Sequence, residues 1–410
     1  MSGPRCRFCE TPLTDTFVDL GMSPISNAYL RAEDISKREP FYPLHARVCG
    51  ECKLVQLEEF ESPEHLFNDY AYFSSYSESW LRHADAYAAM IIPALKLTSK
   101  SLVVELASND GYLLQFFKNR SIGVLGVDPA ANVAKVAQKK GIPTEVAFFG
   151  RQTASRLAEQ GKRPDLLVGN NVLAHVPDIN DFVGGMKILL ANHGTITMEF
   201  PHLMRLIENN EFDTIYHEHF SYLSLIAVEK IFAHHGLRLF CVEELGTHGG
   251  SLRIYACHQD DPRPVGDSIR QLKHRENEAG LNNLEIYRSF NRKAQMTKRR
   301  LLEFLIAAKE QGKVIVGYGA PAKGNTLLNY CGIRTDFLEF TVDRNPYKQG
   351  RFLPGTRIPI YAPERISEVR PDYVLILPWN IKEEIMQQAS FIREWGGQFI
   401  VPIPEVKIYA

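Results

Sequence analysis

The chain has 410 residues, of which 47 are basic and 48 acidic, so its formal net charge is −1. Hydrophobic residues make up 45% and charged residues 23%, the usage of a soluble globular protein rather than a disordered one. This balance excludes a strongly basic surface for nucleic acid, and no run of about 18 apolar residues predicts a membrane span. Since the first residues also lack the apolar core of a signal peptide, we expect a cytoplasmic protein of two or three domains.

Two C-x-x-C pairs stand near the start of the chain, Cys6 with Cys9 and Cys49 with Cys52. Each pair can form a tight turn that aims two thiolates at one point, and two such turns build a tetrahedral zinc site. A disulfide is disfavoured in the cytosol, and neither pair follows a strand and opens a helix as a redox motif should. We predict structural Zn²⁺, with an empty or iron-loaded site as the alternative. The segment 17–30 between the pairs is predicted to be a loop.

An aromatic and polar stretch follows the cysteine pairs, NDYAYFSSYSESW at residues 68–80. Tyr70 and Tyr72 would share one face of an extended segment, and the serines between Ser74 and Ser79 supply hydroxyl groups. These features suit a lid that binds a polyhydroxylated substrate. An aromatic cluster in the hydrophobic core is the alternative interpretation.

A nucleotide-type α/β pattern begins near residue 101. The sequence SLVVELASNDGYLLQFF predicts a buried strand over residues 102–106, a turn with Gly111, and an apolar helix. A second strand ends in Asp128, where a carboxylate can bind ribose hydroxyls. The turn lacks the three glycines that a pyrophosphate needs. With Glu105 before it, the turn resembles the first motif of S-adenosylmethionine-dependent methyltransferases, so we expect this cofactor rather than NAD.

The next strand and its loop, DLLVGNNVLAHVPD at residues 165–178, resemble the post-strand-four loop of class I methyltransferases, beside the methionine part of the cofactor. A further strand, GTITMEFPHL, would extend the sheet to Phe200. The cofactor would lie at the carboxyl edge of this parallel sheet. The predicted cofactor-binding residues are Glu105, Asn109, Gly111, Leu113, Asp128, Pro129, Asn170 and His175.

The stretch YHEHFSYLS at residues 216–224 carries two histidines around a glutamate. A metal site is disfavoured, because His217 and His219 would need further ligands that no nearby carboxylate obviously supplies. A half-buried strand with hydrogen-bonded histidines is a second interpretation. The third is general base chemistry, since a histidine titrates near neutrality, a carboxylate can orient it, and a tyrosine hydroxyl can donate to an enolate. Methyl transfer to carbon requires such a base, because a proton next to a carbonyl must first be removed.

The last third of the chain predicts one or two long helices over residues 276–312, followed by a second, smaller α/β domain. Its first strand leads into a glycine-containing turn, GYGAPAKGNT at residues 317–326. Backbone N–H groups and Lys323 at the start of the following helix suit a phosphate, with a plain tight turn as the alternative. Asp343, Arg344 and Asn345, which end the next strand, are further candidates for contact with a nucleotide.

Together these stretches resemble the sugar C-methyltransferases of deoxysugar biosynthesis, which act on nucleotide-linked 4-keto-6-deoxy sugars. The resemblance runs from residue 6 to nearly the end of the chain, through CRFC, CGEC, DLGMSPISNAYL, DYAYFSS, ELASNDGYLL, GVDPA, NNVLAHVPD, YHEHFSYLS, HGGSLRIY, GYGAPAKGNT and LILPWN to VPIPEVKI. It implies an α/β fold with a Rossmann-like class I methyltransferase core. The implied domains are a zinc module and lid at 1–70, the S-adenosylmethionine-binding methyltransferase domain at 71–275, and a helical strut with a C-terminal α/β domain at 276–410.

The resemblance also implies roles for individual residues. His219 would be the base that removes the proton from the carbon beside the ketone, whereas His217 is expected to be structural. Glu218, Tyr216 and Tyr70 would surround the sugar and stabilise the enolate. The implied substrate-binding residues are Tyr72, Ser74, Asn171, Tyr222, Lys323 and Asn325.

The implied reaction transfers a methyl group from S-adenosylmethionine to a carbon adjacent to the C4 ketone of the sugar, through a base-generated enolate. Methylation at C3 is favoured over C5, and thymidine diphosphate is the expected nucleotide. We expect a monomer with no membrane or nucleic-acid partner. Two alternatives stay open, an O- or N-methyltransferase acting on a similar nucleotide sugar and a non-enzymatic adaptor that binds zinc and a nucleotide.

Overall fold

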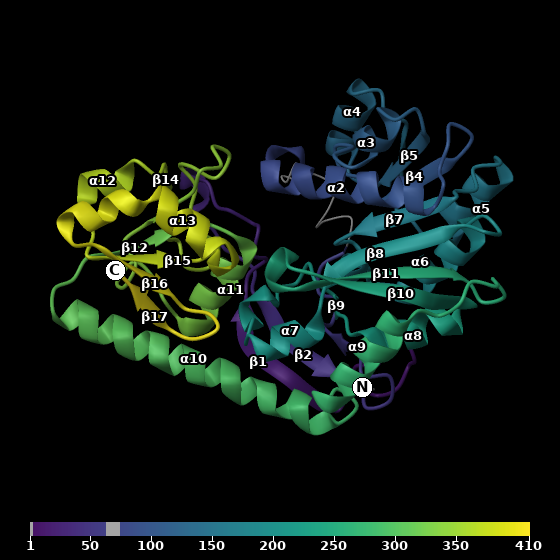
Figure 1. The fold of residues 1–410 in the computed structure, drawn as a ribbon. Coiled ribbons are helices and arrows are strands. Elements are labelled where there is room, and N and C mark those ends of the chain that lie inside the picture. The colour runs from purple at the N-terminus through teal and green to yellow at the C-terminus, as the bar shows by residue number, and fades with distance from the viewer. Residues whose placement is uncertain (1–2, 63–73) are drawn as a thin grey trace. The chain divides into compact units, whose positions relative to one another are not determined.

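The computed structural model describes residues 3–62 and 74–410 (Figure 1). The chain forms two compact units, each assembled from three separate segments. Among the described residues, no helix is both long and apolar enough to cross a membrane. Unit 1 holds Met1–Leu13, Cys49–His202 and Phe220–Asn282, and unit 2 holds Thr14–Val48, Leu203–His219 and Asn283–Ala410.

Unit 1 is built on a seven-stranded sheet with the order β10-β11-β8-β7-β4-β5-β6 (Figure 1). Neighbouring strands are parallel except at β11, which runs antiparallel to both β8 and β10. This is the order expected of a class I methyltransferase core, so the predicted fold class is confirmed. The strands are β4 (Leu102–Leu106), β5 (Gly123–Asp128), β6 (Thr144–Val146), β7 (Leu166–Asn170), β8 (Thr195–Pro201), β10 (Leu237–Leu245) and β11 (Ser251–His258).

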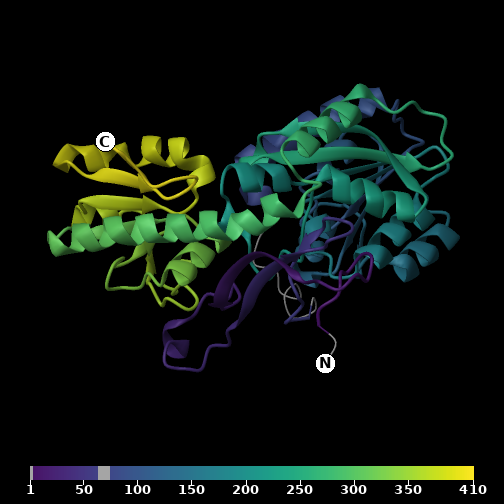
Figure 2. The ribbon, with the colours of Figure 1, turned by 90° about the horizontal axis from the view of Figure 1, so that it is seen from below.

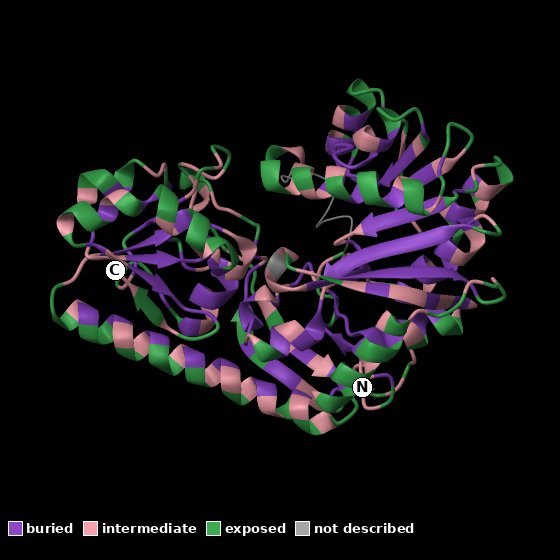
Figure 3. Cartoon of the chain, viewed as in Figure 1, coloured by how far each residue is buried: buried purple, intermediate pink, exposed green. Residues whose placement is uncertain are grey.

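Helices connect the strands of unit 1 and cover its sheet. The central strands are buried along most of their length, as Figure 3 shows, which explains why their sequences are nearly continuous apolar runs. Three of these helices begin with a side chain that caps the backbone, Ser77 before α2, Asp178 before α6 and Ser224 before α8. The helices are α2 (Glu78–Ala94), α3 (Leu114–Lys118), α4 (Ala131–Lys139), α5 (Arg151–Glu159), α6 (Ile179–Leu189), α8 (Leu225–His234) and α9 (Asp267–Glu278).

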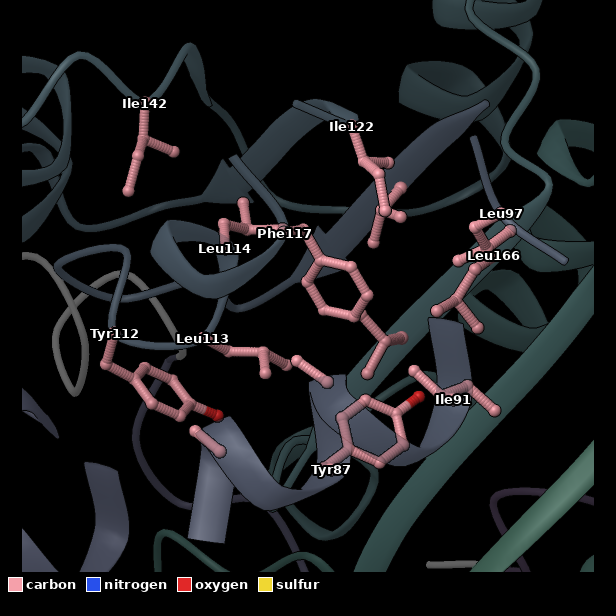
Figure 4. Close-up of a cluster of buried hydrophobic side chains, with 14 of the residues drawn as sticks. Tyr87, Ile91, Leu97, Tyr112, Leu113, Leu114, Phe117, Ile122, Ile142 and Leu166 are labelled. Carbon is pink, nitrogen blue, oxygen red and sulfur yellow. The ribbon is translucent and has the colours of Figure 1, made fainter. Parts of the chain in front are cut away.

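A hydrophobic cluster fixes the first α/β repeat of unit 1 to helix α2. Phe117 of α3 is fully buried and lies among Tyr87 and Ile91 of α2 and Leu166 of β7 (Figure 4). Leu113, which precedes α3, also has no exposed surface. Each large apolar side chain contributes about 1.5–3 kcal/mol when fully buried, so this cluster holds the turn before α3 in a defined place.

Unit 2 contains a six-stranded sheet with the order β14-β13-β12-β15-β16-β17 (Figure 1). Its first five strands are parallel, and β17 adds to the edge in the antiparallel direction. The predicted second α/β domain is therefore confirmed. Its strands are β12 (Ile315–Tyr318), β13 (Thr341–Val342), β14 (Ile360–Tyr361), β15 (Tyr373–Ile376), β16 (Gln398–Val401) and β17 (Lys407–Tyr409), and its helices are α7 (Leu203–Glu208), α10 (Leu284–Glu310), α11 (Ala322–Cys331), α12 (Arg365–Val369) and α13 (Lys382–Gln388).

Helix α10 runs alongside the sheet of unit 2 in both Figure 1 and Figure 2. The Phe304 ring on this helix meets the Tyr373 ring of β15 edge to face, with the ring centres 5.2 Å apart. The predicted helical pattern over residues 276–312 is thus divided, because α9 ends at Glu278 and α10 begins at Leu284.

The prediction of a loop over residues 17–30 was wrong for its first part. Strand β1 (Asp15–Ser23) pairs antiparallel with β2 (Tyr42–Val48), and Phe17 stacks on Phe290 of α10 with ring centres 4.4 Å apart. Two register shifts interrupt the pairing of β1 and β2. These irregularities break the strict alternation of buried and exposed residues, so the strand was not recognisable from its pattern.

Candidate functional site

The four cysteines of the two C-x-x-C pairs converge on one point in unit 1. Their Sγ atoms all lie within 4.8 Å of one another, and the Cys6–Cys52 and Cys9–Cys49 pairs are each 3.5 Å apart. Zinc bound to four thiolates would hold them roughly 3.8 Å apart, so this donor set fits one tetrahedral ion. Such an ion would join the two turns and would leave no coordination position for a substrate.

The carboxyl edge of the unit 1 sheet gathers predicted cofactor residues. Strand β4 pairs in parallel with both β5 and β7, so the residues that end these three strands lie side by side. The turn after β4 has left-handed backbone at Ala107, Asn109 and Gly111. At Gly111 φ is +77° and a Cβ atom would lie 2.4 Å from Ile142 Cδ1, which explains the glycine.

Hydrogen bonds hold the polar groups of this turn. Asn109 Oδ1 accepts from the backbone N–H of Ser74 at 3.0 Å, and Asp128 accepts from the Asn109 N–H at 2.8 Å. Burial raises the pKa of the Asp128 carboxyl. Sequence reasoning missed Asp110, whose Oδ2 forms an ion pair with Lys140 at 3.2 Å. The turn is therefore fixed in shape by its own residues.

A buried charge network lies on strand β8 of the same unit. The carboxylate of Glu199 is fully buried and accepts from His83 Nε2 at 2.9 Å, Arg253 Nη2 at 2.8 Å and the Thr247 hydroxyl at 3.0 Å. The Arg253 guanidinium also lies over the Tyr87 ring, 4.4 Å from its centre. Burial opposes ionisation of Glu199, but the His83 hydrogen bond and the Arg253 charge hold its pKa below the usual value. A charged residue inside each of two apolar strands was the sequence signal for this network.

Residues 216–219, which carry the two histidines, belong to unit 2 and form no strand, whereas Ser221–Tyr222 of the same stretch form β9 in unit 1. Residues 216–219 follow a short 3₁₀ turn, η4 (Phe212–Thr214). The Tyr216 hydroxyl lies 2.9 Å from His219 Nε2, and the two rings are 4.1 Å apart at 32°. His219 Nδ1 donates to the Thr214 carbonyl at 3.1 Å. By contrast, His217 is buried and contacts the Pro43 carbonyl at 3.2 Å.

Glu218 is held by the segment that follows β1. The Ser26 hydroxyl donates to its carboxylate at 3.0 Å and the Asn27 amide donates at 3.0 Å. Burial raises the pKa of Glu218, and these hydrogen bonds oppose the rise. The Asn325 amide of α11 donates to the Ser26 carbonyl at 2.6 Å, so a residue predicted to bind substrate holds this segment in place.

The turn after β12 is tightly packed and leaves no room for a side chain at Gly319. At Gly319 φ is +89° and a Cβ atom would lie 2.5 Å from Pro378 Cδ, which explains the glycine. Lys323 lies with its ammonium 4.4 Å from the centre of the Trp379 ring and donates to the side-chain Oδ1 of Asn380 at 2.9 Å. Burial lowers the pKa of Lys323.

A cavity of about 560 Å³ opens in unit 2 at the carboxyl ends of its parallel strands. Tyr318 ends β12, and Arg344 follows β13, so the cavity adjoins the glycine turn. The carboxyl edge of an open parallel sheet is where such folds bind ligands. The cavity is lined by Tyr318, Arg344, Gln349, Ala362, Pro363, Glu364, Gln388, Ala389 and Phe391.

The remaining predicted residues are placed as follows. Tyr70 and Tyr72 lie outside the described residues. Asn171 follows β7 with a left-handed backbone, and its N–H donates to the Glu199 carbonyl at 2.7 Å. Tyr222 is buried on β9 (Ser221–Tyr222) of unit 1, which pairs with β3 (Val55–Gln56). Pro129 is half-buried on the loop that follows β5, and His175 is half-buried at the end of the 3₁₀ turn η3 (Leu173–His175), which follows β7.

One relative matches nearly the whole chain. It is the C-methyltransferase NovU from Streptomyces niveus, which is 36% identical over 404 residues, or 98% of this chain and 96% of the relative. The chain belongs to the C-methyltransferase family. The predicted enzyme class is therefore confirmed.

Three family models match successive parts of this C-methyltransferase. They are described as "Putative zinc binding domain" at residues 6–67, "Methyltransferase domain" at 80–242, and "C-methyltransferase C-terminal domain" at 246–404. Among solved structures, PH0226 protein from Pyrococcus horikoshii OT3 is 15% identical, with a TM-score of 0.38 over 48% of this chain and 99% of its own. Magnesium protoporphyrin IX methyltransferase from Synechocystis PCC 6803 with bound SAM is also 15% identical, with a TM-score of 0.34 over 43% and 79%. These likenesses are too low to add to the family assignment.

The C-methyltransferase uses S-adenosylmethionine, and unit 1 contains groups that fit it. Glu105 is fully buried at the end of β4, and neither carboxylate oxygen has a hydrogen-bond partner of standard geometry among the described residues. Burial raises the pKa of Glu105 well above its usual value. A cationic ammonium such as that of the methionine part would satisfy this carboxylate. Leu113, in contrast, has its side chain in the hydrophobic core (Figure 4).

Proposed function

We propose that this C-methyltransferase methylates a carbon adjacent to the C4 ketone of a nucleotide-linked 4-keto-6-deoxy sugar. C3 is the favoured position and thymidine diphosphate the favoured nucleotide. The observation that carries the proposal is the Tyr216–His219 pair, with its hydroxyl and imidazole 2.9 Å apart. A carbon acid requires a base and a hydrogen-bond donor for its enolate oxygen, whereas transfer to oxygen or nitrogen needs less.

The hydrogen bonds of His219 assign its neutral tautomer. A carbonyl oxygen can only accept, so the contact with Thr214 puts the proton on Nδ1. Nε2 then carries the lone pair and accepts from the Tyr216 hydroxyl. We assign Nε2 as the base that takes the proton from the carbon beside the ketone.

Tyr216 and Glu218 complete the enolate site in this proposal. When the sugar binds, the Tyr216 hydroxyl turns from Nε2 to the ketone oxygen, which frees the Nε2 lone pair to take the carbon's proton and leaves the hydroxyl donating to the enolate oxygen that forms. Glu218, held by Ser26 and Asn27, would orient the sugar with Tyr70. When bound, S-adenosylmethionine supplies the electrophilic methyl group that the enolate carbon attacks.

The nucleotide part of the substrate is assigned to the carboxyl edge of the unit 2 sheet. Lys323 has no carboxylate within ion-pair distance among the residues described, and it lies at the start of α11 beside the glycine turn. These features suit the diphosphate. The adjoining cavity supplies the Arg344 cation and the Tyr318 ring for the nucleoside.

Product NMR after incubation with S-adenosylmethionine and thymidine-diphosphate 4-keto-6-deoxyglucose tests the proposal. A new methyl carbon bonded to ring carbon C3 is the expected result, and a methyl on oxygen or nitrogen would contradict it. In D₂O without the methyl donor, deuterium should enter the carbon beside the ketone. His219→Asn should abolish this exchange, whereas His217→Asn, which alters a buried histidine on the Pro43 carbonyl, is the matched control.

A further inference from the structure

A buried hydrogen bond anchors the turn that contacts the proposed base. Trp379 Nε1 of the 3₁₀ turn η6 (Trp379–Ile381) donates to Asp213 Oδ2 at 2.8 Å, and both residues are buried. The other oxygen of Asp213 is buried and has no hydrogen-bond partner among the described residues. None of the steps assigned to Tyr216, Glu218 and His219 uses this pair.

The pair fixes the turn that carries the Thr214 carbonyl. Asp213 is the middle residue of η4, and Thr214 follows it with the carbonyl that accepts from His219 Nδ1. On the other side, the Thr326 hydroxyl of α11 donates to the Ile215 carbonyl at 3.0 Å. Thr214 is thus flanked by two residues that are each anchored to a different element of unit 2.

We propose that Asp213 and Trp379 are positioning residues for proton abstraction, because their hydrogen bond holds the Thr214 carbonyl where it fixes the His219 tautomer. The expected effect on the rate of proton abstraction rests on the proposed function, whereas the expected effect on the His219 tautomer does not. If the turn loosens, Nδ1 loses its acceptor and the proton can move to Nε2, which then cannot act as the base.

The face of the Trp379 ring also contacts Lys323, and this contact can be tested separately from the hydrogen bond to Asp213. The ring face lies under the Lys323 ammonium, whereas the indole N–H points to Asp213. Trp379→Phe therefore removes the hydrogen bond and keeps an aromatic face for the lysine. Trp395→Phe is the matched control, because Trp395 in the same unit also donates its indole N–H, to the Pro371 carbonyl at 3.0 Å.

The first measurement is the His219 tautomer, read from long-range ¹H–¹⁵N correlation spectra of ¹⁵N-histidine protein and assigned by the signal missing in His219→Asn. Wild type and Trp395→Phe should show the Nδ1–H form. Trp379→Phe should show a mixture with the Nε2–H form. An unchanged Nδ1–H tautomer in Trp379→Phe would overturn the proposal.

The second measurement is the rate of deuterium exchange into the keto sugar. Trp379→Phe should lower this rate on the order of tenfold to a hundredfold while the dissociation constant of the nucleotide sugar stays at the wild-type value. Asp213→Ala should behave likewise, and Asp213→Asn should restore most of the rate because its amide oxygen still accepts from Trp379. Equal rates in Trp379→Phe and Trp395→Phe would refute the positioning role. If wild type exchanges no deuterium, the proposed function fails, and the tautomer measurement still decides the positioning.

Discussion

Replacing Asp213 by asparagine should remove a pH-dependent loss of stability. Burial raises the pKa of Asp213 from 3.8 to about 7, although the Lys323 charge and the Trp379 hydrogen bond oppose the rise. The folded state therefore keeps a proton that the unfolded state releases, and the free energy of unfolding falls as pH rises from about 4 to about 7. At 1.36 kcal/mol per unit, the loss reaches about 4 kcal/mol, of which roughly 2–3 kcal/mol develops between pH 5 and pH 8.

Scanning calorimetry at several pH values between about 5 and 8 measures this effect. Relative to Asp213→Asn, the wild-type Tm of unit 2 should fall by about 5–10 °C over this range, since 1 kcal/mol is worth roughly 2–4 °C in a domain of 150–250 residues. Asp336→Asn changes an exposed carboxyl of the same unit, so its Tm should change with pH in the same way as the wild-type Tm. If the Tm of Asp213→Asn changed with pH in the same way as the wild-type Tm, the argument that Asp213 is a buried carboxyl with a raised pKa would be refuted.

Three further predictions concern unit 1. Cys49→Ser should reduce bound zinc below one equivalent by elemental analysis and lower the Tm of unit 1, and full zinc content in the variant would contradict the four-thiolate site. Arg253→Met should destabilise the protein by about 3–5 kcal/mol because it leaves Glu199 buried without its cation, whereas the double change with Glu199→Gln should recover much of this loss in urea unfolding. Gly111→Ala should cost about 1–2 kcal/mol of stability, because φ is +77° and the new methyl group meets Ile142. The same change should weaken S-adenosylmethionine binding in calorimetric titration. Unchanged affinity would show that the turn does not contact the cofactor.

Features that depend on residues close together in the sequence could be predicted. The strand before Glu105 is a continuous apolar run, and Gly111 in the turn after it has the left-handed backbone that glycine favours. The four cysteines were recognisable because two closely spaced thiols already define half of a tetrahedral site. In the same way, the tyrosine and histidine of YHEH are three residues apart and form a local contact.

Features that depend on distant pairs could not be predicted. Asp213 and Trp379 are 166 residues apart, and Ser26 and Glu218 are 192 residues apart. A single sequence contains the polar groups but no signal that pairs them. The network of Glu199 was missed for a related reason, because a charge inside an apolar strand shows that a partner exists without showing which one.

The alternation of the two units along the chain constrains how the protein can be made. Strands β1 and β2 leave the ribosome early, but helix α10, on which Phe17 packs, is synthesised more than 230 residues later, at Leu284–Glu310. At a translation rate of about 5–20 residues per second, α10 is synthesised on the order of ten seconds or longer after β1 and β2. During this time the apolar face of the two strands is exposed to solvent. Neither unit is a continuous stretch of sequence, so no single cut yields either one whole. We therefore expect unit 2 to complete its fold only after helix α10 has been synthesised.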